Sequence, residues 1–421
     1  MYTLLICIAS LVLRVIALWN DKIRLFVDGR KNLLSRIETA VKGHDDIIWF
    51  HVASMGEFEE ARPVMEEVRR RYPQKKILLT IFSPSGYSHR KNWKTVDWVF
   101  YLPLDTWFNA RKFIRIVRPS KAVFTIGEFW FNYLGQLKRH HVDTYIMSLL
   151  ASKDSPYLKW YGWPYRRALR SVYKCVMVKN QETKDVLEGF GCRNVEVTGD
   201  ARFDRVMKIA AEDWHDKIVE TWADGKKVAI AGSTGSKDDE LFISLLKDYP
   251  EDKFMFVPHE LDEGPVRHIL DSAPGKSILY TDVEYVFSSG IPDNARSGVM
   301  ETMKQAQVLV VNKIGMLSRL YRYGWCALIG GGFENLPHSV MEAAVYGIPV
   351  AMGPQYHKNK QFVDLMRLGA ADSVSNEKDI HDWFGKYHGD AALLEQAGRI
   401  TEEYCRDNAG ATGRITDIIL G

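Results

Sequence analysis

Cysteine is scarce in this sequence, and its placement excludes several structural roles. The 421 residues include five cysteines, an odd number, which are widely separated and form no C-x-x-C pair. This distribution argues against a disulfide framework and against a cysteine-based zinc site, and it is typical of a reducing compartment. We therefore expect a cytoplasmic protein.

The sequence also has little net charge. The 56 Lys and Arg residues nearly balance the 53 Asp and Glu residues, which leaves a formal charge of +3. The chain therefore lacks the large net positive charge that would predict binding to nucleic acid. Short basic runs such as Arg69–Arg71 are interpreted as solvated helix ends. A hydrophobic fraction of 46% and a charged fraction of 26% are those of a globular protein, whose length fits two domains.

A long apolar run is nearly absent, and only the N-terminus approaches one. Tyr2–Trp19 is almost wholly apolar but is interrupted by Arg14, whereas a membrane span needs about 20 apolar residues. Positive charge follows the run, and Trp19-Asn20-Asp21 stands where a cleaved signal peptide needs small residues. We predict that residues 1–20 are an uncleaved anchor, shallow or spanning, with the protein on the cytoplasmic side. A buried core helix is the alternative.

Beyond this segment, strand-like and helix-like stretches alternate in two series. The first begins with the apolar run at residues 47–54, which precedes a stretch of helical periodicity at 57–72. The second begins at residues 227–231, after a charged stretch. Such alternation predicts parallel sheets covered by helices, and hence an α/β protein with two doubly wound Rossmann-like domains facing a cleft. The predicted parts are an anchor at 1–20, an N-terminal domain at 21–207, a linker at 208–226 and a C-terminal domain at 227–421.

A glycine-rich loop lies between a predicted strand and a helix that begins near Ser339. In Gly330–His338 the glycines would let backbone N–H groups approach an anion, next to a helix N-terminus. The spacing matches neither the dinucleotide fingerprint nor a Walker loop, and a tight turn without a ligand is the alternative. Glu342, one turn into the helix, offers two oxygens to the two hydroxyls of a ribose, although such a residue is more often on the surface.

Two carboxylates follow glycines at predicted strand ends. Glu57 follows Gly56, and Glu128 follows Gly127. The carboxyl ends of parallel strands meet at one edge of a sheet, where a partly desolvated carboxylate can take a proton from a sugar hydroxyl. Each is alternatively a helix N-terminal glutamate stabilised by the dipole. The pair also resembles the two carboxylates of glycoside hydrolysis, but the predicted nucleotide site favours transfer.

No metal site is predicted. There is no Asp-x-Asp triplet at a strand end and no helical histidine pair with ligand spacing. Asp238-Asp239-Glu240 is interpreted as a solvated helix start.

An aromatic and basic stretch spans Tyr157–Arg167. Its amphipathic character suits a lipid interface, and an ordinary packing loop is the alternative.

Five segments together resemble one known family, in combination and in order, over nearly the whole chain. They are His51-x-x-Ser54-Met-Gly56-Glu57, Gly127-Glu128-Phe-Trp130-x-Asn132, Val197-Thr-Gly199-Asp200-x-Arg202-Phe203-Asp204, Ala231-Gly-Ser233-Thr234, and Gly331-Gly332-Phe333 leading into Met341-Glu342-Ala-Ala. The sequence resembles the Kdo transferases, which move 3-deoxy-D-manno-octulosonic acid (Kdo) from CMP-Kdo to lipid A precursor.

The resemblance implies a GT-B fold with the acceptor in the N-terminal domain and CMP-Kdo in the C-terminal domain. It implies inverting transfer, with Glu57 as the general base for a glucosamine hydroxyl and with Glu128 and Arg202 supporting the transition state. The implied CMP contacts are Pro258, His259, Gly315, Met316, Leu317, Ser339, Val340, Met341 and Glu342. It implies no metal and no cofactor, and a place at the cytoplasmic face of the bacterial inner membrane.

Family members often carry arginine where this chain has His259, lysine where it has Arg202, and asparagine where it has Ser339. Two alternatives stay open. One is another GT-B enzyme that uses a UDP-sugar, such as an N-acetylglucosamine transferase or 2-epimerase. The other is a non-catalytic, membrane-bound sugar-nucleotide sensor, which would need neither Glu57 nor Glu128. No protein partner is predicted.

Overall fold

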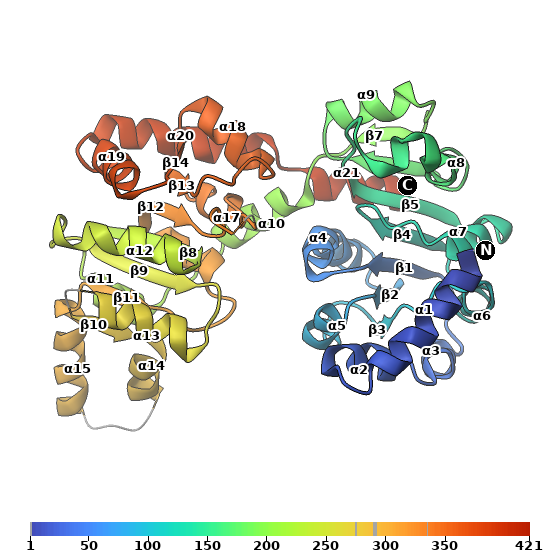
Figure 1. Ribbon diagram of the computed structural model, residues 1–421, viewed down its shortest axis with the longest axis horizontal. Helices are drawn as coiled ribbons and strands as arrows, with labels where there is room; N and C mark the ends of the chain where they lie inside the picture. Colours follow the sequence, from blue (N-terminus) through green and yellow to red (C-terminus); the bar gives the residue numbers. More distant parts are fainter. Residues whose placement is uncertain (1, 274–275, 289–292, 335) are drawn as a thin grey trace. The chain divides into compact units, whose positions relative to one another are not determined.

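The computed structural model describes residues 2–273, 276–288, 293–334 and 336–421. The chain divides into two compact units (Figure 1). Unit 1 comprises Met1–Asp204 together with Asn408–Gly421, and unit 2 comprises Arg205–Asp407.

Unit 1 is built on a parallel sheet that has seven strands in the described residues, in the order β3-β2-β1-β4-β5-β6-β7. The order reverses between β1 and β4, so the carboxyl ends of these two strands flank the point where open α/β sheets bind ligands. The strands are β1 (Ile47–Val52), β2 (Lys76–Ile81), β3 (Trp98–Tyr101), β4 (Lys121–Thr125), β5 (Asp143–Leu149), β6 (Cys175–Val178) and β7 (Val195–Val197).

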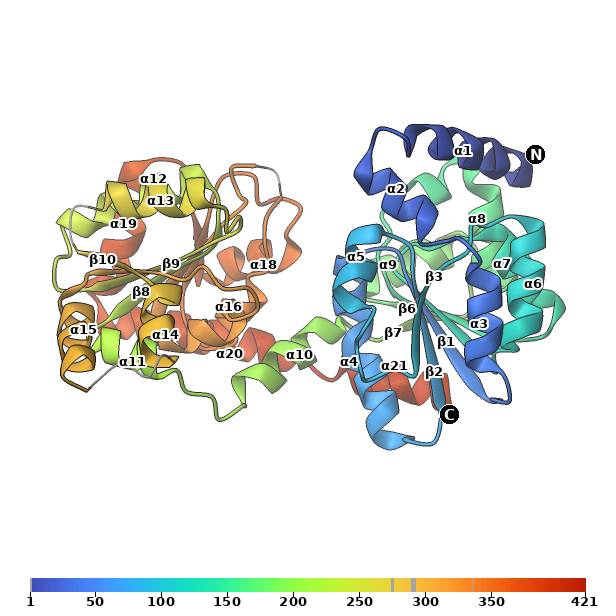
Figure 2. The same cartoon turned by 90° about the horizontal axis from the view of Figure 1, so that it is seen from below.

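Helices cover both faces of this sheet (Figure 2). Every residue of β1 is buried, as expected for a strand covered on both sides. Ile48 and Phe50 pack towards α4 (Met55–Arg71) and α21 (Ala411–Leu420). Trp49 packs on the other face, against the helices α3 (Leu33–Val41), α6 (Trp107–Val117) and α7 (Phe131–Arg139). The other helices that unit 1 contains or shares are α1 (Tyr2–Ile16), α2 (Asp21–Asp28), α5 (Pro84–Arg90), α8 (Trp163–Ser171), α9 (Gln181–Gly189) and α10 (Ala201–Ala210).

The predicted anchor is a short helix that rests on unit 1. Among the described residues, no helix is both long enough and apolar enough to cross a membrane, so a spanning anchor over 1–20 is not supported. The α1 helix has 15 residues, none of them buried. The Tyr2 hydroxyl donates to the Asp105 carboxylate at 2.9 Å, and that carboxylate also accepts from the backbone N–H of Asn132 and Tyr133 at the start of α7.

Unit 2 repeats the architecture, with a second parallel sheet whose described strands follow the order β10-β11-β9-β8-β12-β13-β14. The order reverses between β8 and β12. The strands are β8 (Val228–Thr234), β9 (Lys253–Pro258), β10 (Ser277–Leu279), β11 (Val308–Val310), β12 (Gly324–Ile329), β13 (Val350–Met352) and β14 (Ala371–Ser373). Its helices include α11 (Lys217–Ala223), α12 (Ser236–Ser244), α13 (Glu263–Ser272), α14 (Tyr280–Ser288), α15 (Asp293–Gln305), α16 (Leu317–Leu320), α17 (Met341–Ala344), α18 (Lys360–Leu368), α19 (Glu377–His388) and α20 (Ala391–Asp407).

The α/β class and the two sheets in series are confirmed, but the boundaries differ in two places. Residues 208–226 are not simply a linker, because α11 buries Ile218, Val219 and Trp222 in unit 2. Residues 408–421 were assigned to the C-terminal domain, yet they belong to unit 1. The reason is the apolar stripe of α21, which completes the layer beside α4.

Candidate functional site

Glu57 and Glu128 lie together at the carboxyl edge of the unit 1 sheet. Ser54 caps α4 by accepting from the Glu57 backbone N–H at 3.3 Å. The Glu57 carboxylate folds back and accepts from the Ala53 backbone N–H at 2.6 Å. Glu128 follows β4, and its carboxylate accepts from the Trp130 indole N–H at 2.5 Å. The prediction that both glutamates project at one edge of one sheet is confirmed.

The pKa of the Glu57 carboxyl is raised so far that the group can hold a proton near neutral pH. Burial raises its pKa to about 8, and the negative charge of Glu128 and a hydrogen bond between the two carboxyls act in the same direction. The hydrogen bond from Ala53 opposes the shift without cancelling it. A carboxyl with such a pKa can exchange a proton with a substrate hydroxyl at working pH.

Arg202, which is 32% exposed, contacts a cluster formed by the buried side chains of Glu60, Lys179 and Asp200. Lys179 Nζ lies 2.5 Å from Glu60 Oε1 and 3.0 Å from Asp200 Oδ2. Arg202 contacts the same two carboxylates, at 3.1 Å and 2.6 Å respectively. Burial opposes ionisation of Asp200, yet Arg202 and Lys179 outweigh it and lower the pKa of Asp200. Burial, with the charge of Asp200, raises the pKa of Glu60.

The sequence analysis missed Glu60 and Lys179, although two signals pointed to them. Glu60 lies three residues after Glu57, so helical spacing puts both on one face of α4. Lys179 directly follows β6, at the same edge of the sheet as the two glutamates. The charge of Glu60 contributes to the raised pKa of Glu57, so the buried cluster is electrostatically linked to the proposed base.

The residues predicted to bind the donor gather at the carboxyl ends of strands in unit 2. His259 follows Pro258, the last residue of β9, and its backbone N–H donates to the Thr234 carbonyl at the end of β8. The rings of His259 and His338 lie 4.6 Å apart. Burial, and then the charge of His259, lowers the pKa of His338 to about 4, so His338 is neutral at neutral pH.

The other predicted donor residues surround the same strand ends. Gly315 has a positive φ of 86°, which favours glycine, and it precedes Met316 and Leu317 at the start of α16. Leu317 lies against Gly232 of β8. Ser339 and Glu342 are half-buried, whereas the side chains of Val340 and Met341 are 1% and 2% exposed. Val340 and Met341 can therefore offer a ligand little beyond their backbone.

Two N–H groups of the glycine-rich loop, which the sequence predicts to face an anion, are bonded within the protein. The Gly330 N–H donates to the Gly232 carbonyl at 3.0 Å, and the Gly331 N–H donates to the Asp238 carboxylate at 3.2 Å. A Cβ on Gly330 would stand 2.1 Å from the Ser233 carbonyl oxygen, so this glycine allows two backbones to touch. Asn335 of the loop lies outside the described residues, and α17 is a single turn of four residues.

The interpretation of Asp238 and Asp239 as a solvated helix start is wrong. The two side chains are 1% and 2% exposed, because α12 packs its first turn beneath the glycine-rich loop. Asp238 accepts from the backbone N–H of Gly235 and Gly331 and thereby ties the β8–α12 turn to the β12 loop. The anion that the glycine loop holds is thus the protein's own carboxylate.

We expect Asp239→Asn to stabilise unit 2 above neutral pH. Burial raises the pKa of Asp239 from 3.8 to about 7, assisted by the charges of Asp238, Glu240 and Glu334. The protonated Asp239 side chain therefore stabilises the folded state fully below about pH 4, and this contribution is lost as the pH rises through 7. Urea unfolding should show Asp239→Asn to be more stable by about 2–4 kcal/mol at pH 8, and nearly equal at pH 4. Glu263→Gln, at an exposed glutamate of α13, is the control, and equal stability of Asp239→Asn and wild type at pH 8 would contradict the assignment.

No group of three or more histidine, cysteine, aspartate or glutamate side chains is arranged to hold a metal ion in the part of the chain that the structure describes.

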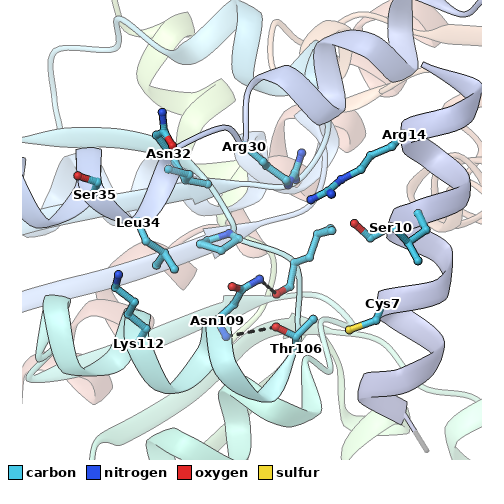
Figure 3. Close-up of a pocket in the computed structure, with 14 residues that line it drawn as sticks. Cys7, Ser10, Arg14, Arg30, Asn32, Leu34, Ser35, Thr106, Asn109 and Lys112 are labelled. Atoms are coloured by element: carbon cyan, nitrogen blue, oxygen red, sulfur yellow. Dashed lines mark hydrogen bonds between the residues drawn. The ribbon is translucent and has the colours of Figure 1, made fainter. Parts of the chain in front are cut away.

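A pocket of about 610 Å³ lies beneath α1 in unit 1 (Figure 3). Cys7, Ser10 and Arg14 of α1 lie across from Asn109 and Lys112 of α6. The walls thus combine apolar surface with three basic residues, Arg14, Arg30 and Lys112. The pocket could not be predicted from the sequence, because its walls come from α1, from residues 30–35 and from residues 103–112, which are separate in the chain.

The sequence is similar to known proteins of one family. Residues 29–205 match the family model of the 3-deoxy-D-manno-octulosonic-acid transferases (Kdo transferases). A Kdo transferase of Aquifex aeolicus (strain VF5) is 25% identical over 352 residues, which are 81% of this chain and 86% of the relative. One of Haemophilus influenzae is 24% identical over 392 residues, which are 88% of this chain and 86% of the relative. The relationship to the Kdo transferases is confirmed.

Solved structures are similar to this chain at the level of the fold. A UDP-GlcNAc 2-epimerase from Neisseria meningitidis, solved with UDP-GlcNAc, aligns with a TM-score of 0.61 at 14% identity and covers 89% of this chain and 99% of its own. MurG from Acinetobacter baumannii aligns with a TM-score of 0.54 at 12% identity and the same coverage. At such identities the likeness supports the two-sheet α/β fold expected of GT-B proteins and carries no information on the substrate.

Proposed function

We propose that this protein is an inverting glycosyltransferase that transfers Kdo from CMP-Kdo to a glucosamine hydroxyl of lipid A precursor. The observation that carries the proposal is the pair Glu57 and Glu128 at the switch point of the unit 1 sheet, with the pKa of Glu57 raised to about 8. The relatives named as Kdo transferases along most of the chain support the donor and the reaction.

In the proposed step the acceptor oxygen attacks the anomeric carbon of Kdo. The bond from that carbon to the phosphate oxygen of CMP breaks, and CMP leaves with the electron pair. The proton of the acceptor hydroxyl passes to Glu57. Glu128 and Arg202 stabilise charge as it develops, since fixed charges and dipoles around a reacting centre lower its barrier.

Unit 2 binds the nucleotide in this proposal. His259 and Gly315–Leu317 contact the phosphate and the cytosine, and Glu342 accepts from the ribose hydroxyls. His259 takes the place of the arginine that many relatives carry, so its contact with the phosphate depends on its protonation, unlike that of a guanidinium.

The nucleotide distinguishes this function from a UDP-sugar enzyme. We expect CMP and CMP-Kdo, measured by calorimetry and by thermal stabilisation, to bind the full-length protein, and Glu342→Ala to weaken that binding. UDP and UDP-N-acetylglucosamine should not bind. Binding of the uridine nucleotides with no response to CMP would overturn the proposal in favour of the epimerase-like alternative. Binding of CMP-Kdo without turnover would favour a sensor.

The lipid acceptor places the reaction at a membrane surface, which we propose is the cytoplasmic face of a bacterial inner membrane. The α1 helix exposes a row of large apolar side chains, including Leu4, Leu11 and Val15. At the N-terminal end of α1 the apolar surface continues towards α8, because Tyr2 packs on Phe131 and Phe131 packs on Tyr165 of α8. Near α8, Trp160 and Trp163 are 87% and 59% exposed. An amphipathic surface of this kind suits insertion into the interface without crossing the bilayer.

We expect the triple substitution Leu4→Ser, Leu11→Ser and Val15→Ser to weaken membrane binding at least about tenfold, because it removes apolar area that would enter the lipid. The measurement is flotation with vesicles of phosphatidylethanolamine and phosphatidylglycerol. Leu368→Ser, an equally exposed leucine on unit 2, is the matched control. Undiminished flotation of the triple variant would refute the role of α1.

A further inference from the structure

His51 is buried directly behind Glu128, in a position that the proposed reaction does not yet use. The side chain is fully buried on β1, between the rings of Phe124 and Trp130, with centroids 5.9 and 5.8 Å away. Its Nε2 lies 3.5 Å from Glu128 Oε2. The sequence motif includes His51 without giving it a role.

The surroundings of Nδ1 favour a hydrogen on that nitrogen. Nδ1 lies 3.1 Å from the Thr80 carbonyl oxygen and 2.9 Å from Thr80 Oγ1. The carbonyl only accepts. The Thr80 hydroxyl accepts from the Trp49 indole N–H at 2.8 Å, and the Phe50 carbonyl oxygen lies 3.4 Å from it. The Thr80 carbonyl, which can only accept, therefore favours a hydrogen on Nδ1.

The carboxylate in front of Nε2 favours a hydrogen there as well. Among the described residues Nε2 has no conventional hydrogen-bond partner, and the polar atom in front of it is Glu128 Oε2. That oxygen already accepts a hydrogen bond from the Trp130 indole N–H at 2.5 Å. A bare Nε2 would direct a lone pair at this carboxylate, whereas an N–H is attracted to it.

We propose that His51 is a positioning residue that stands as an imidazolium behind Glu128 and compensates its negative charge. Glu128 is the titratable group that faces the ring, and Glu57 lies beyond it. The other described groups around the ring, Trp49, Thr80 and Phe124, carry no charge. His51 keeps both of its protons throughout turnover, so it moves no proton to substrate. Its effect is to limit how strongly Glu128 repels the ionised form of Glu57, since an opposite charge next to a carboxylate favours ionisation.

The protonation state can be measured without substrate, by NMR of the full-length protein with ¹⁵N-labelled histidine side chains. His51→Gln assigns the resonances. We expect both nitrogens of His51 to be protonated at pH 7 in the wild type. In Glu128→Gln the buried ring has no counter-charge, and we expect a neutral imidazole. A neutral ring in the wild type, or one unaltered by Glu128→Gln, would overturn the proposal.

The kinetic half of the test rests on the proposed function. The acidic limb of the pH profile of kcat/KM reports the ionisation of Glu57 in the free enzyme. In His51→Gln we expect its midpoint to rise by about one pH unit and kcat/KM at pH 7 to fall about tenfold, with values near wild type restored at high pH. A uniform loss at every pH would mean that His51 is only structural. The exposed His89→Gln is the control, and failure of the wild type to transfer Kdo would refute the proposed function while leaving the NMR result to decide on His51.

Discussion

Glu57→Gln is expected to lower kcat by about 10²–10⁴-fold, the range for loss of a general base. Glutamine keeps the size of the side chain and can still accept from the Ala53 N–H, so the cap of α4 is retained. What it cannot do is take the acceptor proton. Because the nucleotide is assigned to unit 2, the affinity for CMP-Kdo should remain within about twofold of the wild type, since Glu57 removes a proton and binds no donor.

Glu59→Gln is the matched control for this experiment. Glu59 lies on the same helix and pairs with Arg90 at 3.0 Å, away from Glu128. The Glu59→Gln variant should transfer Kdo at nearly the wild-type rate. Turnover of Glu57→Gln above about a tenth of the wild-type rate would show that another group accepts the proton, and Glu128 would be the next residue to examine.

Lys179→Met is expected to destabilise unit 1 by about 3–5 kcal/mol, the cost of removing one member of a buried ion pair. The lysine side chain is 9% exposed, and the two carboxylates that it contacts are 4% and 5% exposed. Methionine fills much of the same space but leaves Arg202 as the single cation for Glu60 and Asp200. Burial already raises the pKa of Glu60, so at low pH Glu60 can take up a proton and remove its uncompensated charge. The loss of unfolding free energy in Lys179→Met should therefore grow as the pH rises.

Urea unfolding followed by a probe in unit 1 measures this loss, with the transition of unit 2 as an internal reference. Lys184→Met is the control, because Lys184 reaches Glu188 and Glu196 only at 3.9 and 4.0 Å from partly exposed positions. It should cost less than about 1 kcal/mol. Equal effects of the two substitutions would contradict a stabilising role for the buried cluster.

The sequence predicted those features whose signal is local. Apolar runs and helical periodicity predicted both sheets, and glycine before Glu57 and Glu128 at strand ends predicted their meeting. Those residues share one sheet edge because parallel strands end together. The role predicted for Arg202 stays a prediction, and the structure shows its contacts with Glu60 and Asp200.

The features that were missed depend on contacts between distant segments. Asp238 reads as a solvated helix start, and only the approach of the β12 loop buries it. Lys179 needs Glu60, 119 residues earlier, to become an ion pair. The α21 helix is separated in sequence from every other part of unit 1, so its apolar stripe gave no indication of which sheet it covers. The anchor prediction failed as a span because composition alone does not fix where a helix ends.

The reaction itself is the most direct test of the account. The full-length protein in detergent should be incubated with CMP-Kdo and tetraacyl lipid A precursor, and the lipid products should be read by mass spectrometry alongside Glu57→Gln. We expect a product heavier by whole Kdo residues with release of CMP in the wild type, and almost none with Glu57→Gln. Unmodified lipid with the wild type, or modification only when a UDP-sugar replaces CMP-Kdo, would contradict it.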